Sequence, residues 1–433
     1  MPPSFAENDV RDLRTGTIYD ELHARPAVDI DCPMLVTHLG YTTDDHGADG
    51  RACIVARRHR IIGLVRQCYA EFAVEPPVDV AHCEAATEDA QFAAQLAVLA
   101  RFKHQETLVR GDRTCIVQTH TEFLGVTFLL QHHNLSDADW SAIPDGIDAW
   151  RSKDFRPDIA THLRVERLDV DQPLAHGLGD AFNCSFRDGF LVGDVFRDLL
   201  ASRVSDGAFA WTPFRPFIDG FNRILVRIAD LSPARTGRLV QRLLEIDTYS
   251  FMALLGLDSA RDQLRMLRQR QSDLGAILKS NGDDRNEQKV AYRRLSALSQ
   301  VTAKDIAATR YRFYASRAYA DVVWERVGQL QEEKVLGWSR IGYFLDRTFR
   351  PAVQTCEAAL NFQNAISQGI QQAAELLGAG VSIDLEFEGK RIERRMLFLT
   401  IAILLLTGMA AVYYTSHVLH DWGLIALPGE HGP

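Results

Sequence analysis

The feature that most constrains this chain of 433 residues is an uncharged apolar run near its C-terminus, Met396 to Tyr414 (MLFLTIAILLLTGMAAVYY). At a rise of 1.5 Å per residue, its roughly 19 residues would form about 28 Å of helix, which matches a bilayer core of about 30 Å. Leu404, Leu405 and Leu406 lie at its centre. The alternative is a buried core helix, but such helices usually carry polar residues within this length. We therefore expect a C-terminal transmembrane helix.

The charges that flank this run predict its orientation. The segment before it, KRIERR, carries one acid, Glu393, and four basic residues: Lys390, Arg391, Arg394 and Arg395. The tail after it offers three histidines and two acids. Because basic residues mark the cytoplasmic side of a membrane helix, the long N-terminal part is expected in the cytosol. The start of the chain lacks the apolar stretch of a signal peptide, so we expect a single-pass C-terminal anchor in the inner (cytoplasmic) membrane.

Charge and cysteine content exclude several classes of protein. The net charge of −9 and a pI near 5.9 argue against nucleic-acid binding, which needs a basic surface to displace phosphate counterions. The seven cysteines are scattered and never form a C-x-x-C pair, which is typical of reduced thiols and gives no metal site. Phosphate loops, dinucleotide fingerprints and H-E-x-x-H motifs do not occur in the sequence. The cofactor, if there is one, stays unknown.

Residues 1–230 predict an α+β domain with an antiparallel sheet. Apolar residues at helical spacing or runs of β-branched residues indicate each element. Helices are expected at Thr17–His23, Cys53–Phe72 and Ala90–Phe102. Strands are expected at Met34–Tyr41, Thr107–Arg110, Thr114–Gln131, Thr161–Leu168, Phe209–Thr212 and Asn222–Ile228.

Residues 231–390 predict a helical, coiled-coil-like stalk. Helices are expected from Pro233 to Gly256, from Asp258 to about Ser280, and from about Asn286 to Lys334, the last about 70 Å long at 1.5 Å per residue. Its apolar stripe, which includes Tyr319, Val323 and Val327, is typical of helix packing. Gly337 and Pro351 are expected to interrupt the next segment. Val381–Phe387 alternates like a strand but is assigned to a helix that leads into residues 391–418, with a short tail at 419–433.

Several segments together resemble a known bacterial family. They include YDELHARP (19–26), THTEFLGVTF (119–128), DGFNRILV (219–226), GRLVQRLLEIDTYSFMALLGL (237–257), RAYADVVWERVGQLQE (317–332) and RPAVQTCEAAL (350–360). The chain is similar in these LHARP and HTEF motifs to uncharacterised membrane-anchored proteins that share a domain of unknown function. The resemblance implies a cytosolic head, a helical stalk and a C-terminal anchor, and it implies no reaction.

Three groups of polar residues are candidates for chemistry. His120 and Glu122 lie two apart in an expected strand, so both would point to one face, where His23 or Arg25 could complete an acid–base or binding site. A solvated polar pair is the structural alternative. Arg25 could instead cap helix carbonyls before Pro26. Arg215 and Asp219 suggest either a binding loop or a turn that an Arg–Asp pair stabilises.

These features leave three function classes open. The first is a membrane-anchored scaffold or interaction protein whose long helices pair with copies of itself or with a partner. The second is a homo-oligomeric ion channel, because a mixed domain, long helices and a C-terminal membrane helix are also the layout of CorA-type channels. The third is an enzyme that uses His23, Arg25, His120 and Glu122. The lack of a recognised catalytic motif favours the first.

Overall fold

The computed structural model describes most of the chain. The described residues are 27–43, 51–81, 88–102, 105–120, 122–131, 140–152, 155–169, 171–176, 178–182, 185–187, 190–192, 198–204, 207–280, 285–378 and 394–409. They form two compact units. Unit 1 contains residues 1–262 and 309–360, and unit 2 contains residues 263–308 and 361–433.

Unit 1 is built on a nine-stranded sheet with the order β11-β8-β9-β10-β5-β1-β4-β3-β2. Its strands are β1 (Met34–Thr42), β2 (Glu106–Arg110), β3 (Arg113–Thr119), β4 (Phe123–Gln131), β5 (Ile159–Arg167), β8 (Leu200–Val204), β9 (Ala208–Thr212), β10 (Asn222–Ile228) and β11 (Glu333–Lys334). Neighbours pair antiparallel except β5 and β10, which pair parallel with Thr161 beside Asn222. The sheet is therefore mixed, and the antiparallel prediction was wrong at this one pair. A small hairpin, β6 (Ser185–Arg187) and β7 (Phe190–Val192), stands apart from it.

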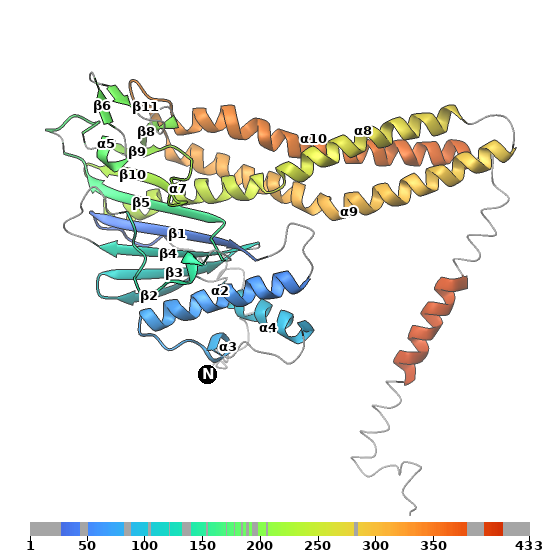
Figure 1. Cartoon of the computed structure of the whole chain (residues 1–433), viewed down its shortest axis with the longest axis horizontal. Helices are drawn as coiled ribbons and strands as arrows, with labels where there is room; N and C mark the ends of the chain where they lie inside the picture. The colour runs from blue at the N-terminus through green and yellow to red at the C-terminus, as the bar shows by residue number, and fades with distance from the viewer. Residues whose placement is uncertain are drawn as a thin grey trace, which may run out of the picture. The chain divides into compact units, whose positions relative to one another are not determined.

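Helices cover both faces of the sheet (Figure 1). Residues of α2 (Arg51–Glu71) and α4 (Glu88–Arg101) pack with Leu35 and Leu39 of β1 on one face. Residues of α7 (Pro233–Leu254) pack with Met34 and Val36 on the other. Successive side chains of a strand point to opposite faces, so every residue of β1 is buried. Short helices complete this part: α3 (Val78–Ala81), α5 (Leu178–Ala181) and the 3₁₀ turn η1 (Ala149–Arg151).

A glycine allows α7 to lie close to the first described segment. A Cβ atom at Gly237 would lie 1.9 Å from the carbonyl oxygen of Val28, so no other residue fits without a backbone shift. The amide of Ile30 donates to the carbonyl of Pro233 at 3.1 Å in the same region. Residues 27–30 therefore pack against the start of α7.

Three long helices follow α7. They are α8 (Leu257–Lys279), α9 (Arg285–Leu330) and α10 (Ile341–Gly378). The C-terminal part of α9 and the N-terminal part of α10 belong to unit 1, where Val323, Leu330, Ile341 and Leu345 join the core over the α7 face of the sheet. The α9 stripe therefore packs within the chain: Val323 is fully buried, and Tyr319 and Val327 pack against the same core.

The predicted helix boundaries were wrong at two places. Helix α9 ends at Leu330 because Gln331 adopts a positive φ of 48°, and Glu333 and Lys334 then pair with β8. Helix α10 continues through Pro351. Pro351 removes one backbone hydrogen bond, but Pro351 and Arg347 one turn before it are exposed, so water can solvate the released carbonyl.

Unit 2 has its own core among α8, α9 and α10. It buries Leu267, Leu274, Ile277, Ala291, Leu295, Ile306, Ile366, Ile370 and Ala373. Arg270 forms an ion pair with Asp305 between α8 and α9. The three helices are thus packed by their own apolar faces and need no sheet.

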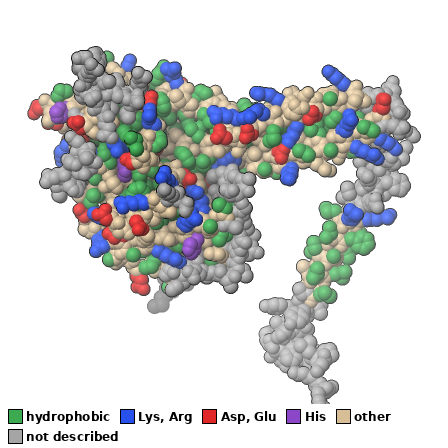
Figure 2. All heavy atoms as spheres, in the orientation of Figure 1, with side chains coloured by type: hydrophobic (Ala, Val, Ile, Leu, Met, Phe, Trp, Pro, Cys, Tyr) green, Lys and Arg blue, Asp and Glu red, His purple; other side chains and the backbone are tan. Residues whose placement is uncertain are grey.

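A separate helix occupies residues 394–409. It begins at Arg394 and Arg395 and then exposes large apolar side chains along its length (Figure 2). Within the described residues, no helix is both long and apolar enough to cross a membrane. The last part of the expected membrane run, 410–414, lies outside the described residues, as do Lys390, Arg391, the segments Thr17–His23 and Val381–Phe387, and the tail.

The burial of the α9 stripe leads to a stability prediction. Val323→Ala should lower the free energy of unfolding by about 2 kcal/mol, because it removes buried methyl groups and leaves a cavity. Val301→Ala, at a half-exposed valine of the same helix, is the matched control and should change it by less than about 0.5 kcal/mol. Urea denaturation followed by circular dichroism measures both. Equal effects would contradict the packing described for α9.

Candidate functional site

Two cavities lie along α7 on its sheet-facing side. Both are in unit 1. The first, called here the histidine cavity, lies between α7 and strands β1, β3 and β4, and its lining includes His38, Gln118, His120, Glu245 and Tyr249. The second, called here the Asp247 cavity, lies among α7, β5, the loop before β10, and α10. Their volumes, about 100 and about 440 Å³, differ enough to favour the second as a ligand site, since pockets for organic ligands usually exceed about 300 Å³.

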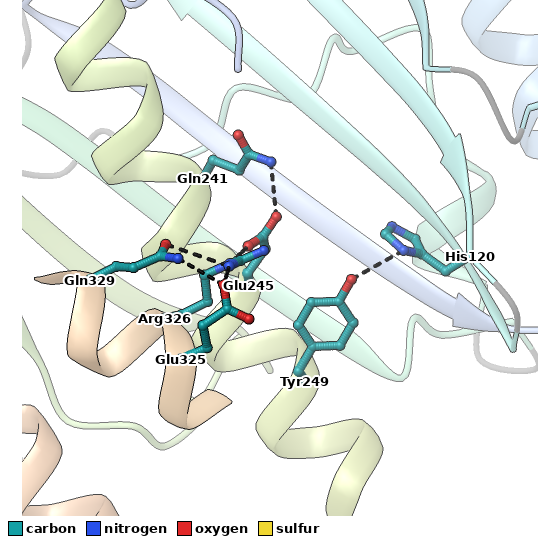
Figure 3. A network of polar contacts seen from close by, with 7 residues as sticks. All are labelled: His120, Gln241, Glu245, Tyr249, Glu325, Arg326 and Gln329. Atoms are coloured by element: carbon teal, nitrogen blue, oxygen red, sulfur yellow. Dashed lines mark hydrogen bonds and ion pairs between the residues drawn. The ribbon is translucent and has the colours of Figure 1, made fainter. Parts of the chain in front are cut away.

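Four polar residues that line the histidine cavity form two separate pairs, His120 with Tyr249 and Gln241 with Glu245 (Figure 3). The Tyr249 hydroxyl lies 3.3 Å from Nδ1 of His120, whose ring stacks on Phe123 at a centroid distance of 4.1 Å. Glu245 accepts from Gln241 at 2.9 Å and forms an ion pair with Arg326 of α9. These contacts join α7 to the β3–β4 turn and to α9.

His38 is the most deeply buried titratable group at this cavity. Its Nδ1 lies 2.8 Å from the Thr127 hydroxyl. Burial lowers the pKa of His38 from 6.5 to about 4, so its imidazole is neutral at pH 7. A neutral, buried histidine of this kind is suited to a fixed hydrogen bond.

His120 and Glu122 do not lie on one strand face. The predicted strand Thr114–Gln131 is in fact two strands, β3 and β4, and both residues lie in the turn between them. His120 contacts Tyr249, whereas Glu122 is buried and accepts from Nη1 of Arg312 at 2.9 Å. The acid–base pair predicted from their spacing is therefore not assembled. His23 and Arg25 lie outside the described residues.

Arg215 and Asp219 have different partners. Arg215 forms an ion pair with Asp198. Asp219 accepts from Arg223 at 3.0 Å and from the amide of Phe221 at 3.0 Å, and Gly220 between them has a φ of +86°. An Arg–Asp pair does hold this turn, but the arginine is Arg223. Arg215 lines the Asp247 cavity instead.

Asp247 is the residue of this site that the sequence interpretation missed. Its Oδ1 accepts from the Asn222 side-chain amide at 3.0 Å, and its Oδ2 accepts from the Thr161 hydroxyl. Burial raises the pKa of Asp247 to about 6, and the hydrogen bonds from Thr161 and Asn222 oppose that rise. A signal was available: Asp247 falls on the helical stripe of Val240, Leu243 and Leu244, where a charged residue is unexpected.

The described residues offer no cluster of three or more His, Cys, Asp or Glu side chains that could hold a metal ion. The linings of the two cavities present hydrogen-bonding groups, the half-buried carboxyls of Asp158, Glu245 and Asp247, and aromatic side chains. Such groups suit binding of an organic molecule.

The chain belongs to the DUF3422 family, described as a protein of unknown function, and the family model matches residues 12–397. The match covers both cavities and the three long helices. No curated protein and no solved structure matches the chain.

The Glu122–Arg312 pair gives a second stability prediction. Arg312→Met should lower the free energy of unfolding by about 3–5 kcal/mol, because it leaves the carboxylate of Glu122 buried without a cation. The double variant Glu122→Gln/Arg312→Met should recover part of the loss. Urea denaturation measures each variant.

The matched control is Arg261→Met, at an exposed arginine paired with exposed Asp258. It should cost about 1 kcal/mol or less. If Arg312→Met costs no more than this control, Glu122 and Arg312 do not form the buried pair described.

Proposed function

We propose that this protein is a membrane-anchored interaction protein. In this proposal, the C-terminal helix enters the inner membrane, the N-terminal part faces the cytosol, and the long helices associate with a second copy of the chain. The observation that carries the anchoring is the helix at residues 394–409, whose ten large apolar side chains are 45–73% exposed.

The distribution of those side chains favours lipid over a protein groove. They include four consecutive residues, Met396 to Leu399, and then Ile401, Ile403, Leu404, Leu405, Leu406 and Met409. Consecutive residues point to all sides of a helix, whereas a helix that binds one groove has a single apolar stripe. The sequence continues with Ala410 to Tyr414, so a helix over the whole run would span the core of a bilayer.

The basic residues before this helix support the cytosolic orientation. Arg394 and Arg395 are its first two described residues, and Lys390 and Arg391 precede them in the sequence. Arginine and lysine at one end of a membrane helix stay on the cytoplasmic side and attract anionic lipid headgroups. The head and the cavities would then be open to cytosolic molecules.

Two observations support the interaction role: three of the candidate polar residues form ion pairs within unit 1, and unit 2 exposes apolar side chains. Glu122, Arg215 and Asp219 form ion pairs within unit 1, which is a structural use. In unit 2, Leu278, Val290 and Leu376 are exposed beside members of one core cluster, since Ile277, Ala291 and Ala374 are their near neighbours in sequence. These three residues, called here the apolar end of unit 2, would meet the same residues of another copy.

Anchoring predicts a loss of membrane association when charge is placed in the run. Leu404→Arg/Leu405→Arg should remove the protein from vesicles, because each arginine near the bilayer centre costs about 2.5–3.5 kcal/mol. Flotation of the full-length protein with liposomes measures this. Leu278→Arg/Leu376→Arg, which makes the same exchange at exposed leucines of unit 2, should float like the unchanged protein. Equal flotation of both variants would refute the anchor.

Self-association predicts that the unit 2 variant changes the number of copies per complex. Leu278→Arg/Leu376→Arg should lower the number of copies per complex, because charges would face each other across the apolar end of unit 2. Mass photometry of the detergent-solubilised protein counts the copies. Leu336→Arg, at a leucine of unit 1 that is 92% exposed, is the matched control and should leave the count unchanged. A count that is one before any substitution would exclude the copy-to-copy contact.

A further inference from the structure

The Asp247 cavity has the size and the lining of a small-molecule site. Its volume of about 440 Å³ falls within the usual range of about 300–1,000 Å³ for ligand pockets. The polar part of its lining includes Asp158, Asn222, Asp247 and Ser250. Four phenylalanines line it as well: Phe214, Phe251, Phe344 and Phe349.

The charged groups at this cavity are paired except for one. Asp158 forms an ion pair with Arg57 and accepts from the Thr42 amide at 2.8 Å. Arg215 is paired with Asp198. Among the described residues, the groups that contact Asp247 are the Thr161 hydroxyl and the Asn222 amide, and neither carries a charge.

The carboxyl of Asp247 retains capacity for another partner. Each of its oxygens accepts one of these hydrogen bonds, whereas a carboxylate oxygen can accept two. Asp247 is half-buried at the cavity, where polarity lower than that of water strengthens an interaction with a positive charge. The side chain is therefore placed to accept from a cationic donor in the cavity.

The aromatic lining favours an organic cation over a metal ion. The faces of phenyl rings carry negative electrostatic potential and attract ammonium groups. Phe214 and Phe344 stack with their centroids 6.1 Å apart, so one wall of the cavity is an apolar, aromatic surface. No cluster of three or more His, Cys, Asp or Glu side chains that could hold a metal ion occurs in the part of the chain that the structure describes.

From this geometry we infer that the Asp247 cavity binds a small organic cation: an amine with an apolar body of a few carbons, whose ammonium group pairs with Asp247 while its carbons contact the phenylalanines. The inference goes beyond the anchoring and association proposed above and does not depend on either. It assigns small organic cations to unit 1 as its class of ligand.

Binding should weaken on acidification. The pKa of Asp247 is about 6 because of burial, so the carboxyl is almost fully ionised at pH 7.5 and roughly 10% ionised at pH 5. An ammonium pairs with the ionised form, and the apparent affinity should fall about tenfold between these two pH values. The other charged groups that line the cavity, Asp158 and Arg215, are held in ion pairs.

The test is isothermal titration calorimetry of the full-length protein in detergent micelles, with n-butylammonium as the probe and n-butanol as its neutral counterpart. Empty micelles serve as the blank. At pH 7.5, n-butylammonium should bind at least tenfold more tightly than n-butanol, and the difference should shrink at pH 5. Equal binding of the two probes, or no binding of n-butylammonium, would overturn the inference.

Two variants assign the binding to the cavity. Asp247→Asn should weaken n-butylammonium binding at least tenfold and leave n-butanol unaffected. Asp258→Asn makes the same exchange at a carboxylate that is 92% exposed, and it should change neither probe. An Asp247→Asn protein that binds n-butylammonium as well as the unchanged protein would refute the role of Asp247.

Phe251→Leu keeps the inference testable if Asp247→Asn does not fold. Phe251 lies one helical turn after Asp247, lines the same cavity and is 36% exposed, so its replacement does not disturb a buried core. Loss of the ring should weaken n-butylammonium binding about threefold and leave n-butanol binding nearly the same. A Phe251→Leu protein with unchanged preference for the ammonium would show that the cavity is not where it binds.

Discussion

The structure of unit 1 depends on the attachment of α7 to the centre of the sheet. Asp247 of α7 accepts hydrogen bonds from Thr161 of β5 and Asn222 of β10, which are direct neighbours in the parallel pair. Parallel pairing is somewhat less stable per residue than antiparallel pairing, and here a side chain from the covering helix contacts both strands. Asn222 also accepts from the amide of Arg223, so this polar link extends into the backbone of β10. Elsewhere along α7, apolar side chains pack against the sheet and attach the helix to it.

Local sequence was sufficient for the elements whose stability comes from one repeated pattern. The apolar spacing of the helix expected at Cys53–Phe72 predicted most of its buried residues. Of its five apolar positions, four lie in the core and Ile54 is half-buried; the four are Ile61, Leu64, Val65 and Cys68. The turn at Asp219 and Gly220 was also visible, because Gly220 supplies the positive φ that the turn requires. The α+β class, the long helices and most strand positions followed from such patterns.

Interactions between distant residues explain what the sequence did not reveal. The turn between β3 and β4 contains no glycine, proline or asparagine, so it resembles the middle of a strand. Two of its residues are held by contacts with residues distant in sequence. Glu122 pairs with Arg312, 190 positions later, and His120 contacts Tyr249, 129 positions later. The same holds for the candidate site. Asp247 was visible as a charge on an apolar stripe, but its partners Thr161 and Asn222 and the cavity around it depend on the topology.

The attachment of α7 and the proposed ligand site use the same carboxyl, and this has an energetic consequence. Burial disfavours the ionised form of Asp247, so above pH 6 the contact between α7 and the sheet includes a charge whose hydrogen-bond partners among the described residues are neutral. A bound ammonium would compensate that charge and would also touch Phe344 and Phe349 of α10 across the cavity. A ligand that binds only the folded form stabilises it by mass action, and this one would do so where the sheet, α7 and α10 meet. Occupancy of the cavity would therefore be transmitted as a change in how firmly these three elements of unit 1 are held together.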